Sequence, residues 1–178
     1  MKTKTLEIPR STTQSLIGIG ITMVLLLVAP LRLASQTSAL RCEPINTQLD
    51  GSIVPCGDSP VGFCAVGVVR TGLLKGTKEA VYLGASPSAG MPGVEPPSTI
   101  SYSATQVFHT EKGDLHMSVV GVSDYARVVF TEVGRITGDT GRFANTTGNL
   151  FIFGTFEPDG IHFKSRVTGE ICLDRATP

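Results

Sequence analysis

The stretch at residues 161–173 alternates between apolar and polar side chains with a period of two. Its apolar-side positions are Ile161, Phe163, Ser165, Val167, Gly169 and Ile171, and its polar-side positions are His162, Lys164, Arg166, Thr168 and Glu170. Successive side chains of a strand point to opposite faces, so this pattern predicts an antiparallel strand with one buried face. No segment after residue 39 shows a helical period, which excludes a helical bundle.

Turn signals divide the preceding sequence into further β-rich runs. These runs cover residues 63–71, 79–83, 100–110, 115–121, 124–132 and 149–156, and turns are predicted at residues 75–78, 111–114, 134–148 and 158–160. Residues 84–98 contain four prolines, which excludes a central strand and favours a long surface loop. Twenty glycines and 11 prolines suit a chain with many turns.

A meander of seven or eight strands can close on itself, because closure leaves no exposed edge. We therefore predict an all-β fold: a single antiparallel closed β-barrel of about eight strands, over residues 63–174. Residues 40–62 carry several prolines and glycines without periodicity, and we expect them to form an irregular N-terminal arm held by a disulfide.

The segment at residues 134–154, GRITGDTGRFANTTGNLFIFG, contains five glycines and connects two β-rich runs. Glycine adopts positive φ freely and aspartate bonds its own backbone, so Gly-Asp-Thr-Gly predicts an ordered turn between a strand and its returning partner. A phosphate-binding loop is excluded, because no Gly-Lys-Ser/Thr follows and no helical pattern begins there.

This segment resembles part of a family of small secreted β-barrels related to allene oxide cyclases and plant dirigent proteins. The shared pattern is Gly-x-Ile-Thr-Gly-x-Thr-Gly-Arg-Phe-Ala-x-x-Thr-Gly-x-Leu, within a likeness that covers roughly residues 62–173. Asp139 stands where the motif commonly has glycine, and Thr146 where it has alanine. The resemblance implies a closed antiparallel barrel. The catalytic positions of these two families cannot be matched onto this chain, so the resemblance does not by itself imply a cyclase.

The N-terminus has the order of a secretory signal. Three basic residues lie within the first ten, residues 16–31 are uncharged and mostly apolar, and small residues follow at 34–39. We expect residues 1–39 to be a signal peptide, cleaved after Ala39. The alternative is an uncleaved membrane anchor, since the apolar run is only slightly short for a spanning helix. The expected location is secreted or periplasmic, with membrane association only if the segment is retained.

Four cysteines follow this segment, and an even number in an exported chain predicts two disulfides with three possible connectivities. Closing the barrel would pair its first and last predicted strands, bringing Cys64 opposite Cys172 at outward-facing positions. Our hypothesis is therefore that Cys64 pairs with Cys172, and that Cys42 pairs with Cys56 to hold the arm. The chain has no Cys-x-x-Cys pair and its histidines are scattered, so we expect no metal ion and no cofactor.

The charge distribution argues against a nucleic-acid partner. Four of the 15 basic residues and one of the 15 acidic residues lie in residues 1–39, which leaves 11 basic and 14 acidic residues beyond them. A mildly acidic domain without a basic stripe is not typical of nucleic-acid binding.

The predicted interior of the barrel is largely aliphatic and aromatic. Its expected members are Phe63, Ala65, Val69, Tyr102, Phe108, Leu115, Met117, Val119, Val128, Phe130, Leu150, Ile152, Phe163, Val167 and Ile171. Four polar residues share this inward parity and are candidate ligand-binding residues: Tyr102, Gln106, Glu132 and Ser165. Burying an unpaired carboxylate is costly, so the alternative places Glu132 at a strand end, in water.

Three functions fit this pattern. The first is an exported module that binds a small apolar molecule in the barrel. The second, suggested by the resemblance, is a cofactor-independent isomerase or cyclase that works mainly by orienting its substrate. The third is a structural or interaction protein with a filled core. An internal cavity separates the first two from the third, and polar groups converging inside it favour the second over the first.

Overall fold

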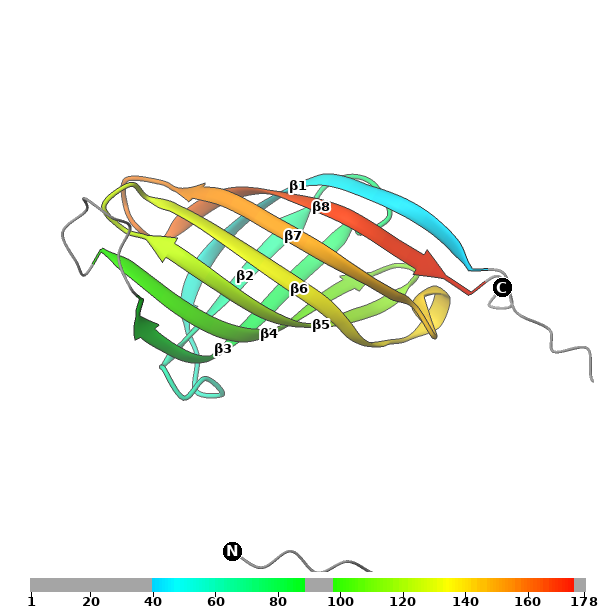
Figure 1. The fold of residues 1–178 in the computed structure, drawn as a ribbon, viewed down its shortest axis with the longest axis horizontal. Helices are drawn as coiled ribbons and strands as arrows, with labels where there is room; N and C mark the ends of the chain where they lie inside the picture. Colours follow the sequence, from blue (N-terminus) through cyan, green and yellow to red (C-terminus); the bar gives the residue numbers. More distant parts are fainter. Residues whose placement is uncertain (1–39, 89–97, 175–178) are drawn as a thin grey trace, which may run out of the picture. The chain divides into compact units, whose positions relative to one another are not determined.

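The computed structural model describes residues 40–88 and 98–174, which form a closed barrel of eight antiparallel strands (Figure 1). The strands are β1 (Arg41–Pro55), β2 (Phe63–Val69), β3 (Gly76–Pro87), β4 (Thr99–Thr110), β5 (Gly113–Asp124), β6 (Val129–Asp139), β7 (Thr147–Phe156) and β8 (His162–Leu173). Each strand pairs with the next along the chain, and β8 pairs with β1. The predicted fold class is confirmed.

Two predicted features lie wholly or partly outside the described residues: the export signal of residues 1–39 and the proline-rich loop, of which residues 89–97 are not described. Within the described ranges, no helix is long and apolar enough to cross a membrane. One short 3-10 helix, η1 (Gly141–Phe143), lies in the glycine-rich connection between β6 and β7.

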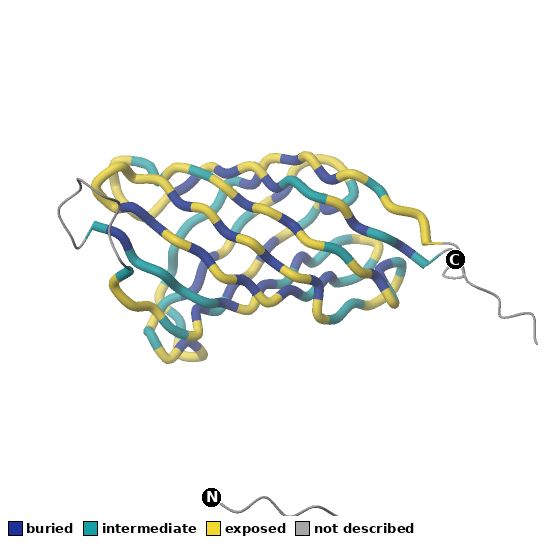
Figure 2. Tube along the Cα trace, viewed as in Figure 1, coloured by how far each residue is buried: buried dark blue, intermediate teal, exposed yellow. Residues whose placement is uncertain are grey.

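Buried and exposed residues alternate along the strands, as the period-two pattern predicts (Figure 2). In β8, the residues Phe163, Ser165 and Val167 are buried and their immediate neighbours are exposed or half-buried. One member of the expected interior is wrong: Val128 is 43% exposed, because it lies in the turn before β6 with a φ of 52°.

The segment at residues 40–62 is not an irregular arm, contrary to the prediction. Residues 41–55 form β1, which pairs with β2 on one side and β8 on the other, so the barrel begins at residue 41. Its inward residues Ile45, Thr47 and Leu49 do alternate with exposed ones. Gly51 interrupts that pattern for a physical reason, because a Cβ there would collide with the ring of Phe163.

The predicted disulfide connectivity is also wrong, although the number of disulfides is confirmed. Cys42 bonds Cys172, its direct partner across β1 and β8, and Cys56 bonds Cys64 between β1 and β2. The prediction correctly expected a disulfide across the closing strands, but it took β2 for the first strand. Two disulfides indicate an oxidising, extracellular-type environment.

The two disulfides differ in the length of chain that they close, with sequence separations of 130 and 8 residues. A cross-link limits the unfolded chain more when its loop is longer. We expect the double variant Cys42→Ser/Cys172→Ser to lose about 2 kcal/mol more unfolding free energy than Cys56→Ser/Cys64→Ser. Urea unfolding of both variants measures this difference. Equal losses, or a greater loss from the short loop, would contradict it.

Candidate functional site

A buried carboxylate lies at the centre of the polar part of the barrel interior. Glu132 is the fourth residue of β6, points inward and is 4% exposed. The Tyr102 hydroxyl donates a hydrogen bond to Oε1 over 3.0 Å, and Gln106 Nε2 donates to Oε2 over 2.7 Å. The alternative that placed Glu132 at a strand end in water is therefore wrong. Both oxygens have a donor, which offsets part of the cost of burying the charge.

Tyr102 reaches Glu132 across an intervening strand because that strand has a glycine at the crossing point. In the register of the sheet, Tyr102 on β4 faces Gly121 on β5, and Gly121 faces Glu132 on β6. A Cβ on Gly121 would lie 2.5 Å from the tyrosine ring and 2.6 Å from its hydroxyl oxygen. The glycine is therefore what lets the ring lie over β5.

Ser165, the fourth predicted site residue, is not part of this cluster. It is buried on β8, and its hydroxyl donates a hydrogen bond over 3.3 Å to the carbonyl oxygen of Leu49 on β1. The structure thus brings together three of the four predicted residues. Ser165 instead supports the pairing of β1 with β8.

Lys78 is a buried site residue that the sequence analysis missed. It lies on β3 and is 2% exposed, although the Lys-Gly-Thr-Lys pattern suggested a turn at this point. Its parity with Ala80 and Tyr82, both inward, is the signal that would have found it. Burial lowers the pKa of the Lys78 ammonium, and the negative charge of Glu132 acts in the opposite direction.

The two tyrosines near Glu132 are held in their protonated form. Burial raises the pKa of Tyr102 and of Tyr82, and the charge of Glu132 raises both further. Because a protonated phenol can donate one hydrogen bond, Tyr102 keeps its bond to Glu132 and Tyr82 keeps an O–H donor across the ordinary pH range. Their ring centroids lie 5.3 Å apart in an edge-to-face arrangement.

A pocket of about 410 Å³ opens at the end of the barrel where these tyrosines lie. It is lined by Ile53, Val54, Pro55, Gly62, Phe63, Tyr82, Ala85, Ile100, Tyr102, Ser123, Tyr125, Phe156, Gly160 and Ile161. We call it the mouth pocket. Five of these residues are aromatic, and the polar side chains are those of Tyr82, Tyr102, Ser123 and Tyr125.

A second, much smaller cavity of about 10 Å³ adjoins the mouth pocket; we call it the inner cavity. Four residues line both spaces: Ile53, Tyr82, Tyr102 and Phe156. The inner cavity is also lined by Lys78 and Glu132, together with apolar side chains of the core. The barrel interior is therefore almost filled below the tyrosines, and open above them.

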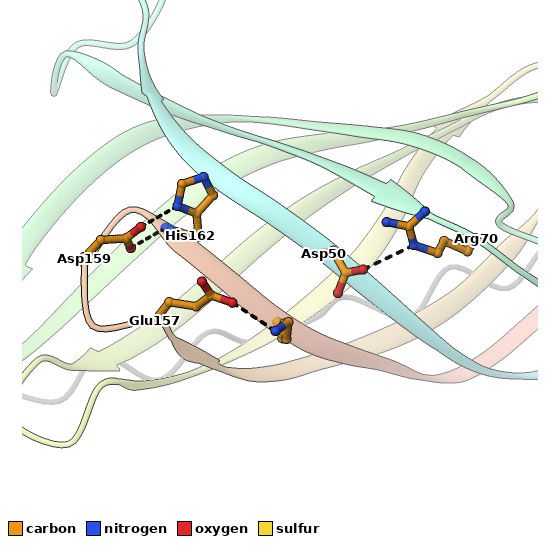
Figure 3. A network of polar contacts seen from close by, with 6 residues as sticks. Asp50, Arg70, Glu157, Asp159 and His162 are labelled. Atoms are coloured by element: carbon orange, nitrogen blue, oxygen red, sulfur yellow. Dashed lines mark hydrogen bonds and ion pairs between the residues drawn. The ribbon is translucent and has the colours of Figure 1, made fainter.

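One wall of the mouth pocket is the turn between β7 and β8, which contributes Gly160 and Ile161. Asp159 orders this turn by accepting hydrogen bonds from the backbone N–H groups of Ile161 and His162 and by pairing with the His162 ring (Figure 3). The histidine and backbone hydrogen bonds lower the pKa of Asp159 to about 2, and the carboxylate raises the pKa of His162.

Other charged pairs lie on the barrel exterior nearby. Asp50 pairs with Arg70 at 3.3 Å (Figure 3). Glu157 pairs with Lys164 at 2.9 Å. Glu157 also lies near Asp159 and His162, within a group whose candidate ligand atoms are all within 4.8 Å of one another. These side chains are exposed or half-buried, and each carboxylate already has a basic partner, Lys164 for Glu157 and His162 for Asp159. We therefore assign them the role of ordering the turn and propose no metal site here.

The fold and the site define a class: a small disulfide-bonded β-barrel with an aromatic pocket at its mouth and a hydrogen-bonded carboxylate beneath. Comparison with protein families, curated proteins and solved structures finds no match. The functional argument therefore depends on the geometry of the pocket and of its floor.

The contact between Tyr102 and Gly121 generates a stability prediction. In Gly121→Ala, the added methyl group must displace the tyrosine ring, and we expect a loss of about 1–3 kcal/mol of unfolding free energy. Gly84→Ala is the control, because a Cβ there meets nothing closer than Ser103 Oγ at 3.9 Å. Urea unfolding compares the two. Similar losses in both variants would show that the ring does not depend on Gly121.

Proposed function

We propose that the protein is a binding module that takes a small apolar molecule into the mouth pocket. The observation that carries this proposal is the pocket itself: about 410 Å³, largely aromatic and aliphatic, above a floor of two tyrosines. Pockets for small molecules typically have volumes of about 300–1,000 Å³, apolar walls and a few placed polar groups. The occupied space is the mouth of the barrel, since the interior below the tyrosines is packed.

We also propose that the protein acts outside the cytoplasm, in a secreted or periplasmic form. The two disulfides support this location, and the signal-like order of residues 1–39 agrees with it. The kinship with allene oxide cyclase-like and dirigent-like barrels is likewise a proposal, supported by the glycine-rich motif and by the closed barrel.

A cofactor-independent isomerase or cyclase is the second candidate, and one specific observation favours it. Tyr102 lines the mouth pocket, and its hydroxyl donates to the carboxylate of Glu132, which lies beneath the pocket and lines the inner cavity. Such a pair can stabilise charge on a substrate oxygen and accept a proton, while the apolar walls orient the substrate. A binding module returns its ligand unchanged and an isomerase does not, so the mass spectrum and chromatographic identity of recovered ligand distinguish the two.

Binding is tested with N-phenyl-1-naphthylamine, an apolar dye whose fluorescence rises in apolar surroundings. We expect the purified protein to bind the dye and Ile100→Asp to weaken binding by about tenfold or more, because a carboxylate in the pocket wall must then be desolvated. Val107→Asp is the matched control. It is half-buried on the same strand, outside the mouth pocket.

The control variant should bind the dye as the wild type does. Circular dichroism of both variants establishes that the barrel is intact. The proposal fails if the wild type does not bind the dye, or if the two aspartate variants weaken binding equally.

A further inference from the structure

Two buried side chains around Glu132 have unused hydrogen-bonding capacity: Lys78, which lines the inner cavity, and Gln106, which lies on the neighbouring strand β4 and is not among the residues that line it. Among the described residues, the Lys78 side chain makes no hydrogen bond or ion pair, although it lines the cavity. The negative charge of Glu132 nevertheless acts on the pKa of its ammonium group. Gln106 Oε1 is buried without a partner, while the Nε2 of the same amide bonds Glu132. A buried polar group without a partner is costly and uncommon in a native protein.

These two groups lie close together in the sheet. Lys78 faces Phe108 and Ala80 faces Gln106 in the pairing of β3 with β4, so Lys78 and Gln106 are diagonal neighbours that both point inward. Diagonal neighbours are within reach of one another when their side chains are long. One is an unused donor and the other an unused acceptor, so a single group that both accepts and donates would satisfy the two.

The inner cavity has room for one such group. Its volume of about 10 Å³ corresponds to about one water-sized oxygen. It also shares four lining residues with the mouth pocket, so the two spaces are adjacent.

We propose that the inner cavity is a subsite for one hydroxyl oxygen, and that the ligand is an apolar molecule carrying a neutral hydroxyl group. This inference rests on the proposed function, since the apolar body of the ligand occupies the mouth pocket. The hydroxyl oxygen accepts a hydrogen bond from Lys78, and its proton is donated to Gln106 or to Glu132. Water takes the same position when no ligand is bound.

Other oxygen groups fit the subsite less well. A carbonyl oxygen accepts from Lys78 but has no proton for Gln106. A carboxylate would face the negative charge of Glu132, and Lys78 is the single basic side chain among the residues that line the cavity. The arrangement therefore selects for a neutral group that is both donor and acceptor.

The test uses three probes of one size class that differ in a single substituent: 2-naphthol, 2-methylnaphthalene and 2-naphthoate. Each competes with N-phenyl-1-naphthylamine for the purified protein. Hydrophobicity alone favours the methyl compound. The subsite instead predicts that 2-naphthol binds about tenfold more tightly than 2-methylnaphthalene, because the hydroxyl makes hydrogen bonds that the methyl group cannot make. It also predicts that 2-naphthoate binds more weakly than 2-naphthol.

The variant Lys78→Met keeps the length of the side chain and removes its donor, and we expect it to abolish the preference for 2-naphthol. Lys75→Met is the control, because Lys75 is exposed and lines neither space. If Lys78→Met does not fold, Gln106→Met removes the acceptor instead and should reduce the preference.

Each remaining outcome has a distinct meaning. If the protein binds the dye but has equal affinity for 2-naphthol and 2-methylnaphthalene, the hydroxyl subsite is contradicted. The proposal that the mouth pocket binds an apolar molecule is then retained. A preference that persists in Lys78→Met, or 2-naphthoate as the tightest probe, also overturns the hydroxyl subsite. Failure of the wild type to bind the dye contradicts the proposed function, and it also contradicts the subsite, which depends on that function.

Discussion

The carboxylate of Glu132, held by Tyr102 and Gln106, is the interaction on which the candidate site depends. It joins β4 to β6 across β5, and it can do so only because Gly121 leaves space for the tyrosine ring. A buried charge needs hydrogen-bond donors, and these two donors therefore have little freedom to move elsewhere. Tyr102 is fixed as a result, and it becomes the boundary between the packed interior and the open mouth pocket.

Closure of the barrel is the second condition for the site. The pairing of β1 with β8, with Cys42 and Cys172 in direct register, leaves no free sheet edge and sets the positions of both ends of the barrel. The other disulfide, between Cys56 and Cys64, joins the chain on either side of the β1–β2 connection. That connection supplies Gly62 to the wall of the mouth pocket. The disulfide and the strand pairing therefore both constrain the open end of the barrel.

Much of the fold is predictable from the sequence, because alternation and turn residues are local signals. Parity alone places Tyr102 and Gln106 on the inner face, and it places Glu132 there once β6 is known to extend beyond it. The first strand is not predictable in the same way. Gly51 is required by contact with Phe163, a residue more than a hundred positions away, and the local sequence shows only an interrupted pattern.

The errors in the site share this cause. The disulfide connectivity depends on which strand closes the barrel, so missing β1 gave the wrong partner for Cys172. The Lys-Gly-Thr-Lys pattern predicts a turn at Lys78, whereas the structure places this residue at an inward position of β3, where the charge of Glu132, three strands away, acts on it. The mouth pocket is formed by residues from separate strands and connections, and no sequence motif marks them as a group.

The most direct test of this account is a double-mutant cycle between Tyr102→Phe and Glu132→Gln, measured as unfolding free energies in urea. If the hydroxyl and the carboxylate bond each other inside the barrel, the two substitutions are coupled, and we expect a coupling energy of about 1 kcal/mol or more. Additive effects, agreeing within about 0.3 kcal/mol, would show that the two groups do not interact and would contradict the account.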